Sequence, residues 1–145
     1  MVVSYEILHQ FSVGQPNERL IWTLEDVVID CLQTYGIKSG RKNGLTGVWV
    51  EDDKICAMGV RLSKWVTMHG FAFNLDPDMT YFDGMIPCGI FEYGVTSLEE
   101  LDIQFSSIDI QIKIMNLLVQ FVKVQINFLI KKIFLKLKRA NMWLF

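Results

Sequence analysis

The sequence has few of the residues that bind transition metals or form disulfide frameworks. It contains two histidines, His9 and His69, and three cysteines, Cys31, Cys56 and Cys88, with no CxxC pair among them. Zinc sites need three or four closely spaced cysteine and histidine ligands, so we expect no metal ion. An odd set of unpaired thiols also favours a reducing compartment over secretion.

Acidic residues are missing from the last quarter of the chain. All 16 of them lie at or before Asp109, whereas seven of the 14 basic residues follow it. Residues 1–109 therefore carry sixteen acidic and seven basic side chains, a net charge of −9, and residues 110–145 carry a net charge of +7. An acidic body lacks the basic face that binds phosphate backbones, which argues against a nucleic-acid partner.

The tail at 106–145 also has no glycine and no proline, and it is rich in Ile, Leu, Phe and Lys. Asn116, Gln120 and Lys123 interrupt its apolar run, so it is too polar to span a membrane. A basic amphipathic helix on a membrane surface is one alternative. The interpretation that we rank first is an atypical tail outside the domain at 1–105, such as an unspliced or frame-shifted end.

A length of 145 residues, 51% of them hydrophobic, indicates one packed α/β domain. Thr23 is the expected N-cap of the best predicted helix, and Gly36 its stop. A charged turn is expected to join two strands into a hairpin. The predicted elements are strands at 2–8, 47–50, 55–62 and 69–75, a helix at 24–35, a helical turn at 79–85 and a helix start at 96–100.

Cys88 is the candidate nucleophile among the three cysteines. Cys31 lies on the apolar stripe of the predicted helix and is expected to fill the core. Cys88 instead lies between Pro87 and Gly89, which favours a rigid, exposed thiol with backbone N–H groups free for an oxyanion. A reactive thiol needs a nearby positive charge, which Lys54 in the hairpin can supply. From the residues alone, a buried Cys88 and a solvated Lys54 at the hairpin rim remain alternatives.

The chain contains five informative blocks of sequence: GVWV at 47–50, KICAMGV at 54–60, WVTMHGFAFN at 65–74, PCGI at 87–90 and VTSL at 95–98. Together they resemble the octanoyltransferases of lipoate synthesis, also called lipoate-protein ligase B. The resemblance covers about residues 2–100 and implies a mixed sheet flanked by helices, of the biotin and lipoate protein ligase type. A family segment ending in His-Gly-Pro-Gly-Gln does not precede the first strand, so we expect a domain that is incomplete at its N-terminus.

The resemblance implies transfer of an octanoyl group from acyl carrier protein to a lysine of a lipoyl domain, without a cofactor. The implied acceptors are the lipoyl domains of 2-oxoacid dehydrogenase E2 subunits and the glycine cleavage H protein. Cys88 matches the residue that carries the acyl thioester, and Lys54 matches the residue that lowers its pKa. His69 has either a direct catalytic part or a role in ordering its strand. The residues that match the backbone of the acyl pocket are Ala57, Met58, Gly59, Gly70, Phe71 and Ala72.

Other functions stay open at this point. Without the missing segment the chain is expected to be poorly active and prone to aggregation. One alternative is a non-catalytic module that binds lipoyl domains or acyl carrier protein, and another is a fragment that associates with membranes through residues 110–145. The resemblance implies mitochondria for a eukaryotic source and the cytosol for a bacterial one.

Overall fold

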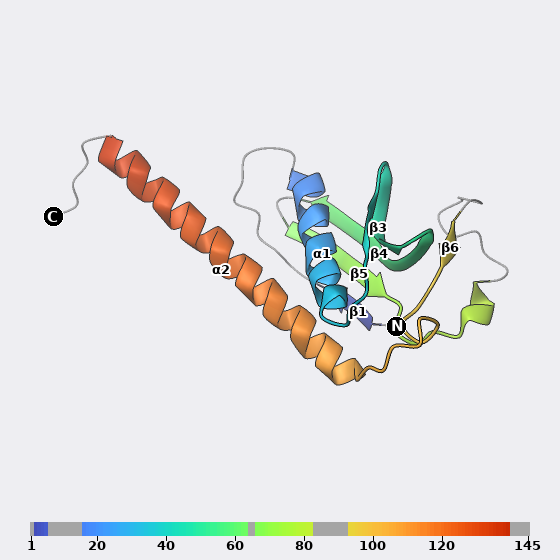
Figure 1. Cartoon of the computed structure of the whole chain (residues 1–145). Helices are drawn as coiled ribbons and strands as arrows, with labels where there is room; N and C mark the ends of the chain where they lie inside the picture. Colours follow the sequence, from blue (N-terminus) through green and yellow to red (C-terminus); the bar gives the residue numbers. More distant parts are fainter. Residues whose placement is uncertain (1, 6–15, 64–65, 83–92, 140–145) are drawn as a thin grey trace.

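The computed structural model describes residues 2–5, 16–63, 66–82 and 93–139 (Figure 1). Its strands form one sheet in the order β1-β5-β4-β3-β2, with β6 pairing with β4 off this path. The strands are β1 (Val2–Tyr5), β2 (Gly40–Lys42), β3 (Leu45–Val50), β4 (Asp53–Ser63), β5 (Val66–Phe73) and β6 (Gly94–Val95). The helices are α1 (Pro16–Gln33), the 3-10 turn η1 (Met79–Tyr81) and α2 (Ser107–Arg139).

Helix α1 begins seven residues before the predicted N-cap, so the prediction for Thr23 is wrong. The reason is Pro16, whose fixed φ suits the first position of a helix and whose missing N–H is not needed there. The predicted stop is confirmed. Gly36 has a φ of +77°, and two backbone bonds close the last turn, from Gly36 N–H to the Gln33 carbonyl and from Ile37 N–H to the Leu32 carbonyl.

The predicted hairpin is confirmed as β3 and β4, which pair antiparallel around a turn at Glu51 and Asp52. The other neighbours along the sheet are also antiparallel, whereas β6 pairs with β4 in parallel. The sheet is therefore mixed and flanked by helices, which confirms the predicted fold class. The strand expected at 2–8 is confirmed for Val2–Tyr5, and residues 6–8 lie outside the described part.

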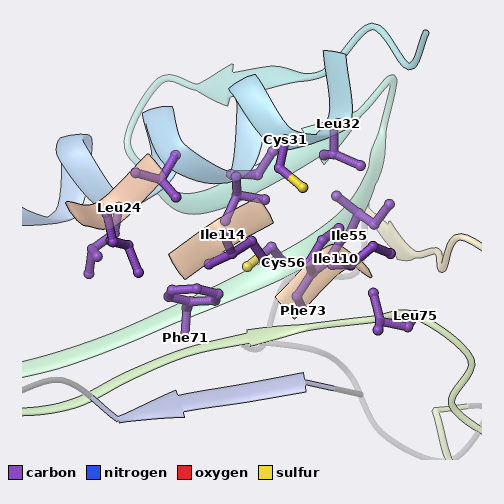
Figure 2. Packing of buried hydrophobic residues seen from close by; sticks show 14 of the residues in the cluster. Leu24, Cys31, Leu32, Ile55, Cys56, Phe71, Phe73, Leu75, Ile110 and Ile114 are labelled. Carbon is purple, nitrogen blue, oxygen red and sulfur yellow. The ribbon is translucent and has the colours of Figure 1, made fainter. Parts of the chain in front are cut away.

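One face of the sheet packs against α1 and the start of α2 (Figure 2). Phe71 and Phe73 point from β5 toward these helices, and Ile110 and Ile114 of α2 lie between α1 and the sheet. No helix covers the other face of β4 and β5 within the described residues, and Ala57 and Gly59 are exposed there. The core is thus one-sided in the described part of the chain, and Ala57 and Gly59 lie on the face opposite to it.

Two local predictions in the C-terminal third need correction. The expected helix start at 96–100 is a single turn: Ser97 Oγ accepts from Glu100 N–H, as at an N-cap, but Asp102 with a φ of +54° ends the turn at once. The helical turn expected at 79–85 is confirmed as η1 for Met79–Tyr81, while residues 83–85 lie outside the described part.

Helix α2 contains the described part of the predicted tail from Ser107 onward. Its first three turns contribute Ile110, Ile114 and Leu118 to the core, and the helix then extends away from α1 and the sheet (Figure 1). Among the described helices, none combines the length and the apolar character that a membrane crossing requires. The boundary at residue 105 and the origin of the tail stay predictions.

Candidate active site

Lys54 is a buried lysine rather than the rim residue that the hairpin pattern suggested. Lys54 is only 7% exposed, and its Nζ lies 4.6 Å from the centroid of the Trp49 ring. Trp49 pairs with Lys54 and Val48 pairs with Cys56, so Ile55 is an extra residue on β4, a β-bulge directly after Lys54. Bulges occur preferentially near active sites because they redirect neighbouring side chains.

The segment that follows Cys88 in the sequence is hydrogen-bonded to the backbone of Lys54. Val95 of β6 pairs with Lys54 in parallel, and Thr96 N–H donates to the Lys54 carbonyl at 3.1 Å. Asn74 reinforces this junction because its Nδ2 donates to the Thr96 carbonyl at 3.1 Å and its backbone N–H donates to the Ile55 carbonyl at 3.0 Å. These hydrogen bonds fix the position of β6 and Thr96 beside Lys54.

Asn74 is a structural residue of the site that the sequence interpretation did not single out. It is 7% exposed, and its carbonyl also accepts from Leu98 N–H at 3.2 Å. A polar amide at the end of the apolar run 71–75 was the available signal, since buried polar groups are almost always hydrogen-bonded.

An aromatic and cationic cluster surrounds the same junction. The rings of Trp49 and Tyr93 meet edge to face with centroids 5.3 Å apart. Lys42 Nζ lies 4.3 Å from the Tyr93 centroid and 5.5 Å from the Trp49 centroid, and it also forms an ion pair with Asp52. Trp49 thus lies between two ammonium groups, those of Lys42 and Lys54. Its indole Nε1 has no hydrogen-bond partner within the described chain.

Glu25 connects helix α1 to the strand beside Lys54. This carboxylate is 2% exposed, and it accepts from Gly47 N–H at 2.8 Å and from Arg41 Nε at 2.7 Å. Arg41 also donates to Asp26 at 2.7 Å and to the Trp22 carbonyl at 2.6 Å. The sequence signal for Glu25 was its place next to the apolar Leu24 in α1, a helix whose last turn has no basic residue.

The Glu25→Ala variant is expected to lose about 2–3 kcal/mol of unfolding free energy, because the buried Gly47 N–H loses a charged acceptor. Urea denaturation followed by circular dichroism measures this loss. Asp26→Ala is the matched control. It removes the other carboxylate bound to Arg41, but the Asp26 side chain is 64% exposed, so about 0.5 kcal/mol is expected. Equal losses in the two variants would contradict a special role for the Glu25–Gly47 bond.

The predicted pocket residues come together on the uncovered face of the sheet. Ala57 pairs directly with Ala72, and Gly59 pairs directly with Gly70. These four small residues form a patch on β4 and β5, which we call the small-residue patch. It begins three residues after Lys54, and the predicted role of its residues in an acyl pocket stays a prediction.

Met58 and Phe71, the middle residues of the two predicted pocket segments, have side chains on the opposite face. Phe71 is 3% exposed within the core, and Met58 packs against that core. Side chains alternate along a strand, so only the backbones of these two residues can contribute to the uncovered face. Their predicted role, which concerned the backbone, stays a prediction.

His69 lies in β5 opposite Val60, with an exposed side chain and a φ of +70°. Residues other than glycine seldom have positive φ, and such strain concentrates at functional sites. Both predicted roles, catalysis and ordering of the strand, stay open.

Cys88 lies outside the described residues. The other two cysteines are poor nucleophiles, because Cys31 is 1% exposed and Cys56 is fully buried, and burial raises the pKa of both thiols. Lys54 opposes the shift at Cys56, but burial dominates. Cys31 is in the core as predicted. Within the described residues no group of three or more His, Cys, Asp or Glu side chains is arranged to hold a metal ion.

Comparison with known families identifies the domain. The model of the lipoyl protein ligase A/B catalytic domain matches residues 2–120. This chain belongs to that family. Among the curated relatives, the octanoyltransferase of Cytophaga hutchinsonii is 53% identical over 105 residues, covering 68% of this chain and 43% of the relative. The octanoyltransferase of Cereibacter sphaeroides is 39% identical over 121 residues, covering 74% of this chain and 56% of the relative. The chain thus spans about half the length of these relatives.

Solved structures support the fold. A protein of T. acidophilum, described as a putative lipoate protein ligase with bound lipoic acid, aligns with a TM-score of 0.61 at 12% identity, covering 77% of this chain and 48% of that one. The biotin protein ligase of Aquifex aeolicus aligns with a TM-score of 0.56 at 20% identity, covering 72% of this chain and 45% of that one. At these identities the likeness concerns the fold alone.

Proposed function

We propose that this chain carries the acyl-transfer site of an octanoyltransferase. In the first step the Cys88 thiolate attacks the thioester carbonyl of octanoyl-acyl carrier protein, a new thioester forms on Cys88, and the carrier thiolate leaves. In the second step a neutral lysine amine of a lipoyl domain attacks this thioester, the amide forms, the amine proton passes to solvent, and the Cys88 thiolate is regenerated. Lys54 favours the thiolate in both steps through its positive charge.

The observation that carries this proposal is the attachment of the segment after Cys88 to Lys54. Five peptide units separate Cys88 from Tyr93, and Val95 and Thr96 are bonded to the backbone of Lys54. A chain of five residues spans at most about 18 Å, which limits the separation of Cys88 and Tyr93 and is compatible with contact between the thiol and Lys54. The small-residue patch beside Lys54 supports an acyl chain as the group that is transferred.

The decisive experiment is intact-mass spectrometry after incubation with octanoyl-acyl carrier protein. The expected result is a mass gain of one octanoyl group that hydroxylamine removes, as it does from thioesters, and that is absent in the Cys88→Ser variant under the same treatment. A labile octanoyl group that persists in Cys88→Ser would contradict the proposal. Binding of a lipoyl domain that is equal in Cys88→Ala and in the unmodified chain, without any acylation, would favour the non-catalytic module instead.

The Gly59→Leu variant is expected to gain octanoyl at least about 10-fold more slowly, since a large side chain would occupy the small-residue patch, while acetyl transfer is largely retained. Nothing lies within 4 Å of a Cβ added at Gly59, so the fold should tolerate the change. Gly40→Leu is the control. A Cβ added at Gly40 also has nothing within 4 Å, and Gly40 lies in β2, away from the small-residue patch. Equal acylation rates for Gly59→Leu and the unmodified chain would place the acyl chain elsewhere.

A further inference from the structure

Helix α2 has a second apolar stripe that the fold does not use. Within its described side chains, Ile110, Ile114 and Leu118 are buried in the core. A separate set is exposed, with Ile108 at 68%, Ile112 at 53%, Met115 at 65%, Val119 at 48% and Val122 at 37%. At 100° per residue, this set lies about 120° around the helix from the core-facing set. We call it the outer stripe.

The spacing of the outer stripe is that of a coiled coil. Its members follow one another at intervals of four, three, four and three residues, and Ile126, Leu129 and Ile133 continue the same alternation in the sequence. The a and d positions of a heptad repeat are therefore apolar at eight successive places, from Ile108 to Ile133. A mean interval of 3.5 residues keeps such a stripe facing one neighbouring helix along its full length. The matching partner of this stripe is another long helix.

The charge distribution favours a second copy of the same chain as the partner, in antiparallel orientation. Residues 1–109, which form the body, carry a net charge of −9, and residues 110–145 carry +7. A parallel pair would place two basic C-terminal halves side by side. An antiparallel pair places the basic half of each helix along the acidic body of its partner, which lowers the electrostatic energy.

The register of the stripe suits this orientation. An antiparallel pair centred between Val119 and Val122 brings Val119 against the partner's Val122, and Met115 against the partner's Ile126. Residues beside the first half of the stripe are Asp109, Gln111 and Asn116, with no basic residue among them. A helix that lies on an anionic membrane has basic residues along its apolar face, so these flanks favour a protein partner over a lipid surface.

We propose that α2 forms an antiparallel coiled coil with the α2 helix of a second copy, which makes the protein a homodimer. Sedimentation equilibrium of the full chain tests this, and the expected mass is twice 16.8 kDa. The double variant Ile112→Lys/Val119→Lys is expected to sediment as a monomer with unchanged helical circular dichroism, because both side chains are exposed within one chain. Val124→Lys is the control, since Val124 is 62% exposed but lies off the outer stripe, and it should remain a dimer.

Cysteine crosslinking tests the orientation, in a Cys88→Ser background whose remaining cysteines are buried. The Met115→Cys/Ile126→Cys variant is expected to form disulfide-linked dimers, and Met115→Cys alone is not. Crosslinking of Met115→Cys alone would show a parallel pair and overturn the proposed orientation. A monomeric unmodified chain, a larger assembly, or an unchanged dimer in the double lysine variant would overturn the proposal, as would a monomer that floats with phosphatidylglycerol vesicles through the outer stripe.

Discussion

The Gly47→Ala variant is expected to lose about 3 kcal/mol or more of unfolding free energy. Gly47 has a φ of +125°, which a residue with a side chain adopts only with strain of about 1–3 kcal/mol. A Cβ at this position would also lie 2.6 Å from the Cys56 carbonyl oxygen, a backbone atom of the paired strand that cannot rotate away. Relief of this contact requires β3 and β4 to separate beside the buried Val48. Urea denaturation measures the loss.

The matched control is Gly44→Ala, which separates strain from contact. Gly44 also has a positive φ, +75°, but nothing lies within 4 Å of an added Cβ. Only the conformational cost of about 1 kcal/mol should remain. If both variants lose the same stability, the approach of Gly47 to Cys56 is not the constraint. Because Lys54 Cε lies only 3.4 Å from the same Cβ position, Gly47→Ala should also disturb the lysine of the site.

Patterns of local chemistry predicted the β3–β4 hairpin, β5 and the end of the first helix, but not the short strands β2 and β6. The β3–β4 hairpin follows from two β-branched runs joined by a charged turn, and Gly36 ends α1 by the backbone geometry that only glycine adopts easily. The start of α1 was missed because a hydroxyl at Thr23 resembles an N-cap, whereas Pro16 sets the true first turn. Such competing start signals are resolved by packing of the whole apolar stripe, which a local pattern does not contain.

For the candidate site, too, some features were predicted from the sequence and others were missed. Lys54 and Gly59 were selected from sequence by their family match, and their roles stay predictions. The burial of Lys54 was not predicted, because a charged residue next to a turn resembles a solvated one. Glu25 and Asn74 were missed as well. Each acts through backbone groups far away in the sequence, Glu25 through Gly47 and Asn74 through Thr96, so only the folded chain shows their partners.

Lys54 occupies a junction where three parts of the chain meet. Its ring contact is with Trp49 of β3, its carbonyl accepts from Thr96, and the bulge at Ile55 follows it. A buried positive charge is only weakly screened by water, so it acts strongly on a nearby group. The proposed use of this charge is the ionisation of a thiol.

The Lys54→Met variant is expected to shift alkylation of Cys88 to higher pH. An ammonium about 4 Å from a thiolate contributes up to roughly 4 kcal/mol at an effective dielectric of about 20. Half of that amount would change the ionisation constant of the thiol by about 30-fold. Loss of the ammonium raises the pKa of Cys88, so the thiolate forms at higher pH. The measurement is the rate of carbamidomethylation by iodoacetamide, followed by mass spectrometry between pH 5 and pH 10.

The midpoint of this pH profile is a better readout than a rate at one pH, because a thiolate of higher pKa is also a stronger nucleophile and partly offsets the smaller thiolate population. Cys31 and Cys56 do not interfere, since both are buried with raised pKa values. Lys42→Met is the control, because it removes the other ammonium beside Trp49 while leaving Lys54 in place. A midpoint that moves equally in both variants would indicate a general field rather than a Cys88–Lys54 pair, and a midpoint that stays unchanged in Lys54→Met would rule out the proposed role of this lysine.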